Sequence, residues 1–183
     1  MDDASCELIL YACPVGELAT QLDAYYARTR AEFGPNTAHR YPPHVTLTGF
    51  FHDTAAAIPI YIQALATALA AAPQPPTITI TGTMFEPTFH GLLIESPWLK
   101  DLTKAFAWLA HSPTRRDALR LKDWLHLSLA YDFPPEHHAP LAECGRAMVD
   151  IAASVRWELR LYERYGMHEW RCHCTRTPGL IAT

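Results

Sequence analysis

His44-Val45-Thr46-Leu47 and His126-Leu127-Ser128-Leu129 share one pattern: a histidine, an apolar residue, a hydroxyl residue and a second apolar residue. In a β-strand, residues i and i+2 point to the same face. Each stretch would therefore present an imidazole and a hydroxyl together and bury its two apolar side chains. Two such strands side by side would form a site with four polar side chains.

Two other His-x-Thr triplets occur, at His52-Asp53-Thr54 and His173-Cys174-Thr175. The first has an aspartate in its middle position, and the second is followed by Arg176. An ordinary strand with a polar outer face would also give the pattern once. Only the copies at His44 and His126 have the alternation of a half-buried strand, and their occurrence as a pair favours a functional site.

The composition is that of a globular protein. The chain has 183 residues, of which 49% are hydrophobic and 19% are charged, enough for one domain with a core of its own. Its formal net charge of -4 gives no general attraction to nucleic-acid backbones. Any nucleotide ligand should therefore be small or contacted locally.

The N-terminus and the cysteine count indicate a reducing compartment. The first residues are polar and acidic, unlike a secretory signal, and the five cysteines are an odd number. We therefore expect a cytoplasmic protein. Residues 55–72 carry no formal charge, but Pro59, Gln63 and Thr67 interrupt them, and their apolar residues recur at helical spacing. We expect a buried amphipathic helix here and no contact with a membrane.

The rest of the chain alternates between strand and helix patterns. Apolar or alternating runs predict strands at 8–11, 77–81, 91–95, 124–133, 157–162 and 170–174, besides the first motif. Helices are expected over 18–29, over 55–72, from the cap Ser96 to Leu109, and from Pro134-Pro135 to Ile151. This order predicts an α+β fold with a largely antiparallel sheet and helices on its outer faces. No linker divides the chain, so we expect a single domain over 1–183.

With both motifs in place, the sequence resembles the 2H phosphoesterases, a superfamily that includes RNA 2′,5′-ligase-like proteins and cyclic phosphodiesterases. The resemblance extends to Phe33-Gly34-Pro35, to Gly82-Thr83-Met84-Phe85 and to the segment 157–162. The short chain is most similar to the compact branch that opens ADP-ribose 1″,2″-cyclic phosphate and nucleoside 2′,3′-cyclic phosphates. The resemblance implies a bilobal fold, in which two pseudo-symmetric lobes of antiparallel sheet meet at a central groove.

The resemblance also implies roles for the motif residues. His44 and His126 would serve as general acid and base, and Thr46 and Ser128 would donate hydrogen bonds to the phosphate. The pattern does not assign the base, although we favour His126. The substrate would be a small cyclic nucleotide or an RNA end, and no metal or other cofactor is implied. We expect a bell-shaped pH profile and a monomer.

Two aromatic residues are candidates for binding the substrate. Tyr131 follows the second motif, and Trp170 lies in the last expected strand. Five other polar residues are expected to be solvated loop groups, although any of them near the groove could receive a phosphate: His39, Arg40, Arg115, Arg116 and Lys122. His137-His138 is expected at an exposed helix start.

Three other interpretations remain open. Cys172-His173-Cys174, with His168 nearby, could bind a metal, although the cysteines can equally be small core residues of a strand. Cys13 or Cys144 could be a nucleophile, but no local signature supports either. A non-catalytic module that binds a nucleotide or RNA is the alternative to an enzyme.

Overall fold

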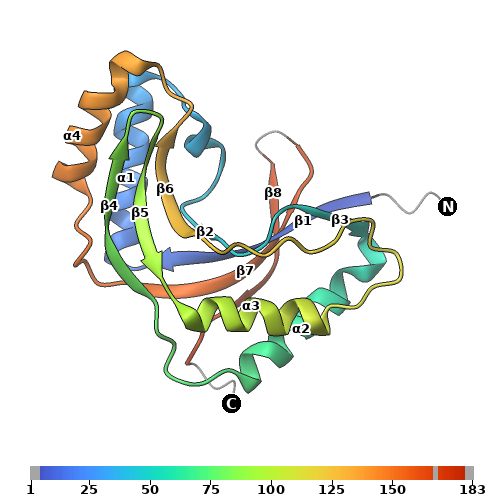
Figure 1. Ribbon diagram of the computed structural model, residues 1–183. Helices are drawn as coiled ribbons and strands as arrows, with labels where there is room; N and C mark the ends of the chain where they lie inside the picture. Colours follow the sequence, from blue (N-terminus) through green and yellow to red (C-terminus); the bar gives the residue numbers. More distant parts are fainter. Residues whose placement is uncertain (1–4, 167–168, 180–183) are drawn as a thin grey trace.

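The computed structural model describes residues 5–166 and 169–179 (Figure 1). In this part of the chain, one sheet contains eight strands, all of whose pairings are antiparallel: β1 (Ser5–Val15), β2 (Val45–Thr46), β3 (Phe51–Thr54), β4 (Thr79–Glu86), β5 (Phe89–Glu95), β6 (Leu125–Tyr131), β7 (Arg156–Arg164) and β8 (Trp170–Arg176). Four α-helices accompany them: α1 (Glu17–Phe33), α2 (Ile58–Ala71), α3 (Pro97–Leu109) and α4 (His138–Met148). The expected α+β class is confirmed.

The short strand β2 joins the two halves of the sheet. The strand order is β4-β5-β6-β2-β1-β7-β8, and β3 also pairs with β1. The two expected sheets are thus hydrogen-bonded into one through the first motif. Helix α1 packs against α4 near the β4–β6 half, and α2 packs against α3 at the other end of the molecule (Figure 1). A division into two pseudo-symmetric lobes stays a prediction.

Strand β1 is buried on both faces, which explains its continuous apolar sequence. Leu8 and Leu10 point into the main core, whereas Ile9 and Tyr11 belong to a second cluster on the opposite face. A strand covered on both sides has no need for alternating polar residues. Tyr11 is therefore held rigidly on the face that carries the first motif.

Helices α1 and α2 each bury one mostly apolar face. Leu18, Leu22, Tyr25 and Thr29 are the buried residues of α1. Helix α2 lies within the expected range and buries Tyr61 and Leu65. No helix in the described residues is long and apolar enough to cross a membrane.

Several element boundaries differ from the prediction. Strand β4 continues past Gly82 to Glu86, so the sequence 82–85 belongs to a hairpin with β5. Strand β6 ends at Tyr131, because Asp132 has a φ of 54°, which cannot continue an extended strand. Helix α4 ends before Ile151, which is 38% exposed, because Val149 turns to extended geometry. Strand β3 was not predicted.

Candidate functional site

The two motifs lie side by side in the centre of the sheet. Val45 of β2 pairs with Leu127 of β6 in antiparallel register, and both side chains are fully buried. Continuing this register by one residue in each direction places His44 opposite Ser128 and Thr46 opposite His126. The two copies of the pattern are thus related by a local two-fold axis, with both imidazoles and both hydroxyls on the same face.

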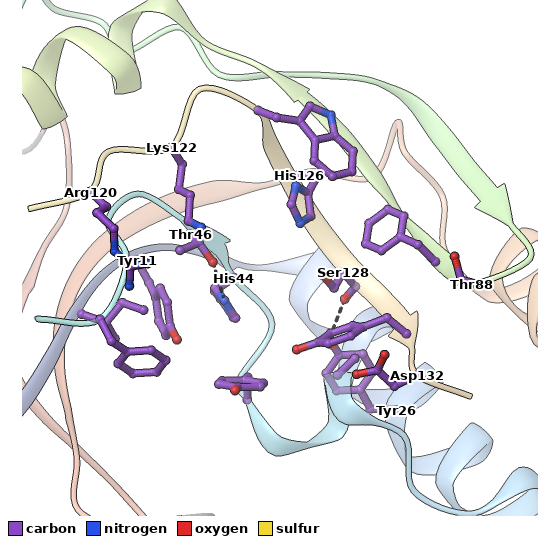
Figure 2. Close-up of a pocket in the computed structure, with 18 residues that line it drawn as sticks. Tyr11, Tyr26, His44, Thr46, Thr88, Arg120, Lys122, His126, Ser128 and Asp132 are labelled. Carbon is purple, nitrogen blue, oxygen red and sulfur yellow. Dashed lines mark hydrogen bonds between the residues drawn. The ribbon is translucent and has the colours of Figure 1, made fainter. Parts of the chain in front are cut away.

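That face is the floor of a pocket of about 480 Å³ (Figure 2). All four motif side chains line it, as does Tyr131. The remaining lining comes from several elements and comprises Ile9, Tyr11, Tyr26, Ala38, Tyr41, Gly49, Phe50, Thr88, Phe89, Arg120, Lys122, Trp124 and Asp132. The fold therefore collects in one pocket polar residues that are far apart in the sequence.

His44 is held in one orientation and one tautomer. Its Nδ1 lies 2.7 Å from the carbonyl oxygen of Pro42, and its Nε2 lies 3.0 Å from Oγ1 of Thr46. Burial lowers the pKa of His44 to about 4. The neutral ring must carry its hydrogen on Nδ1, because a carbonyl oxygen only accepts, so Nε2 accepts from the Thr46 hydroxyl. The ring also stacks on Tyr11, with centroids 3.7 Å apart.

His126 also lies among aromatic rings, but its buried Nδ1 has no hydrogen-bond partner in the described residues. Trp124 lies over its ring at a centroid distance of 4.0 Å, and Phe89 packs edge-on at 5.2 Å. Burial lowers the pKa of His126, and the positive charge of Lys122 lowers it further. The carbonyl of Trp124, two residues upstream as Pro42 is of His44, raises this pKa and partly offsets both effects. Both imidazoles therefore have pKa values below the ordinary value of histidine.

Two contacts position the backbone of Ser128. The Tyr26 hydroxyl donates to its carbonyl oxygen at 2.7 Å, and Gly91 of β5 is its partner in the neighbouring strand. A Cβ on Gly91 would lie 2.5 Å from the ring of Phe89 and 2.8 Å from the carbonyl oxygen of Leu127. Glycine at this position lets the Phe89 ring lie against the strand that carries the second motif.

Arg120 and Lys122 also line the pocket. Lys122 was expected to be a solvated loop charge that could receive a phosphate if it lay near the groove, whereas Arg120 was missed. The signal was present in the alternation of Arg120, Lys122, Trp124, His126 and Ser128, which all line the pocket. The alternation was not recognised because Asp123 interrupts the apolar residues that lie between these positions.

Of the two aromatic candidates, only Tyr131 is among the lining residues. Trp170 packs behind the lining, where its ring contacts Tyr41 at a centroid distance of 5.5 Å and Tyr11 at 6.1 Å. Its indole nitrogen donates to the Arg40 carbonyl at 3.1 Å. The geometry therefore gives Trp170 a supporting position.

The other polar candidates have structural partners or lie elsewhere. His39 is buried and bonds to Thr29 Oγ1 and to the amide of Asn36. Arg40 is exposed and lines a neighbouring pocket. Arg116 lines a third pocket, and Arg115 donates to the carbonyl of Ala110.

His137 and His138, at the start of α4, are less exposed than expected. Helix α4 begins at His138, as predicted, but the Nδ1 of His138 lies 2.9 Å from Nε2 of the buried His90. His137 packs against Phe33 at a centroid distance of 5.5 Å. Both rings therefore contribute to packing around the helix start.

The structure gives little support to a cysteine nucleophile or to a metal site at residues 172–174. Burial raises the pKa of the Cys13 thiol to about 12, which keeps it protonated, and Cys144 is also buried. His173 pairs with Glu163 at 2.8 Å. The described residues contain no group of three or more His, Cys, Asp or Glu that could hold a metal ion. His168 lies outside the described residues.

Comparisons with known proteins agree with this geometry. No family model matches the sequence. The structure of Escherichia coli LigT complexed with ATP superposes with a TM-score of 0.53 and 17% identity, covering 95% of this chain and 98% of that one. LigT complexed with phosphate gives the same TM-score. This chain has the fold of LigT.

The 2H resemblance seen in the sequence is therefore confirmed at the level of the fold. Two curated relatives contain a similar segment. The chain is 30% identical over 168 residues to an ecdysteroid-phosphate phosphatase of Bombyx mori, covering 86% of this chain and 24% of that protein. It is 28% identical over 167 residues to the human ubiquitin-associated and SH3 domain-containing protein B, covering 86% and 25%. This chain thus spans about a quarter of the length of these relatives.

Proposed function

We propose that this protein is a metal-independent phosphodiesterase that hydrolyses a cyclic phosphate by two-histidine acid–base catalysis. The substrate class is a nucleoside or RNA-end 2′,3′-cyclic phosphate, or ADP-ribose 1″,2″-cyclic phosphate. The observation that carries the proposal is the antiparallel pairing of the two motifs at Val45 and Leu127, with all four polar side chains in one pocket.

The chemistry needs two proton transfers on opposite sides of one phosphorus atom. Water attacks phosphorus, the bond to one ribose oxygen breaks, and a phosphomonoester forms. One histidine in its neutral form accepts the proton that water loses, and the other, protonated, gives a proton to the departing oxygen. Each positioned transfer accelerates the reaction by roughly 10²- to 10⁴-fold. A pair of imidazoles related by a two-fold axis suits this exchange.

The hydroxyls complete the site. Thr46 and Ser128 would donate to the non-bridging oxygens and stabilise the charge that builds up in the transition state. The bound anion would also raise the pKa of both imidazoles, which favours the protonated form of the acid. Neither the proton transfers nor this stabilisation of charge requires a metal ion.

The comparisons support a phosphoester and a small nucleotide as ligands. LigT has been crystallised with ATP and with phosphate, and one relative is named as a phosphatase. Because this chain covers only a quarter of that relative, the activity in its name can belong to another part of it. A monomeric, cytoplasmic protein remains part of the proposal.

A substrate panel tests the proposal. A nucleoside 2′,3′-cyclic phosphate, ADP-ribose 1″,2″-cyclic phosphate and a 2′,5′-linked dinucleotide are incubated with the protein, with and without a chelator, and products are separated by chromatography. We expect a cyclic phosphate to be opened at a rate that the chelator does not change. Binding of these compounds without turnover would instead identify a nucleotide-binding module.

The pH profile of kcat/KM should be bell-shaped with its maximum below about 6.5, the ordinary pKa of histidine. This parameter reports the free enzyme, in which one imidazole must be neutral and the other protonated. Burial lowers the pKa of His44 to about 4 and also lowers that of His126. Activity should therefore fall as pH rises through the higher of the two lowered values. Initial rates at low substrate concentration check this, and a maximum above pH 7 would contradict it.

A further inference from the structure

The pocket differs in charge at its two ends (Figure 2). Arg120 and Lys122 lie on one side of the four motif residues, and Asp132 lies on the other with Tyr26 and Thr88. The proposed chemistry places the reacting phosphate in the middle of the pocket and assigns no part of the ligand to either end.

Backbone hydrogen bonds hold the positive end of the pocket, formed by Arg120 and Lys122, beside the first motif. The amide of Lys122 donates to the carbonyl of Leu47 at 3.1 Å, and the amide of Gly49 donates to the carbonyl of Arg120 at 2.7 Å. The guanidinium of Arg120 lies 3.1 Å from the point where a Cβ on Gly49 would be. The glycine therefore leaves room for this guanidinium at the edge of the pocket.

The two cations are not neutralised locally. In residues 5–166 and 169–179, neither side chain lies within 4.0 Å of a carboxylate. Arg120 does lower the pKa of Asp117, but the Asp117 carboxylate is hydrogen-bonded to His52 at 2.6 Å. The positive end is thus available to an anionic ligand in a protein whose net charge is -4.

We infer that Arg120 and Lys122 form a second anion subsite, which selects cyclic phosphates that carry a further phosphoryl group on the 5′ side. This inference rests on the proposed function. The reacting phosphate already has two imidazoles and two hydroxyls, whereas the planar guanidinium of Arg120 matches a second phosphate. The opposite end carries Asp132, which repels a phosphate and can accept hydrogen bonds from ribose or base.

Three substrates with the same base test the inference: adenosine 2′,3′-cyclic phosphate, its 5′-phosphorylated form, and a dinucleotide that ends in adenosine 2′,3′-cyclic phosphate. We expect at least one of the two longer substrates to be preferred by roughly 10- to 100-fold in kcat/KM, the range for hydrogen bonds to charged groups. Preference for the 5′-monophosphate identifies a terminal phosphate, and preference for the dinucleotide identifies an internucleotide phosphate. The preference should shrink as salt is added.

Arg120→Gln should reduce this preference by about tenfold or more. Arg116→Gln is the matched control, because Arg116 is an exposed arginine of the same loop that lines a different pocket, and it should leave the preference unchanged. Equal turnover of all three substrates, or equal losses with all three in Arg120→Gln, would overturn the subsite and leave the proposed function standing. Failure to open any of them, or ADP-ribose 1″,2″-cyclic phosphate, would instead reject the proposed function.

Discussion

Alanine in place of His44 or His126 should lower kcat/KM for a nucleoside 2′,3′-cyclic phosphate by about 10²- to 10⁴-fold in each case. Each substitution removes one of the two proton transfers and leaves the hydroxyls and the other imidazole in place. The double variant should lose less than the product of the two single losses, because groups that act in one step are not additive. Steady-state rates of the four proteins measure this.

His52→Ala is the matched control. His52 begins another His-x-Thr triplet, but it lines a different pocket, where its Nδ1 bonds to Asp117 at 2.6 Å. This variant should keep the rate of the parent protein. Thermal unfolding should show that the His44 and His126 variants remain folded. A folded His44→Ala or His126→Ala protein with unchanged kcat/KM would contradict acid–base catalysis by this pair.

The two roles can be separated with a better leaving group. An aryl phosphodiester expels a phenolate that needs little protonation, so the variant that lacks the acid should regain most of its activity, whereas the variant that lacks the base should not. We expect recovery for His44→Ala, which would make His126 the base. Recovery of His126→Ala would reverse the assignment, and recovery of neither would argue against a dedicated acid.

Much of the fold followed from local patterns in the sequence. The buried face of α1, the Ser96 cap of α3 and the alternation of β7 all depend on residues close together in the chain. The motif residues were found for the same reason, since a histidine and a hydroxyl two residues apart must share a face of a strand. Their presence in one pocket was a hypothesis until the sheet topology brought β2 and β6 together.

What the sequence could not give depends on pairing between distant segments. The local alternation places Arg120 and Lys122 on the same face as His126, but they reach the pocket only because residues 120–122 hydrogen-bond to the distant residues 47–49. Strand β3 was missed because His52-Asp53-Thr54 alternates polar with polar. Its Asp53 is buried and accepts hydrogen bonds from the hydroxyls of Tyr61, on the following helix α2, and of Thr114, which is distant in the sequence.

Gly91→Ala should lower kcat/KM by about 10²-fold or more, the size of loss that a displacement of about 1 Å in an active site can cause. The added methyl group would lie 2.8 Å from the carbonyl oxygen of Leu127, the residue between His126 and Ser128. It would also lie 2.5 Å from the ring of Phe89, which packs on His126. A side chain can turn away, but the carbonyl belongs to the central strand β6, so that strand must shift. Overpacking of this kind also costs about 1–3 kcal/mol of stability.

Gly82→Ala is the matched control, because it makes the same change in the adjacent strand β4, where a Cβ would meet nothing within 4 Å. It should leave turnover unchanged. A second variant, Gly91→Ala with Phe89→Ala, separates the two contacts. If the ring were the only obstacle, removing it would restore the geometry of Ser128, whereas a clash with Leu127 predicts that the double variant stays impaired. Full activity of Gly91→Ala itself, measured alongside thermal unfolding, would mean that β6 tolerates the shift and that the positions of His126 and Ser128 do not depend on the glycine.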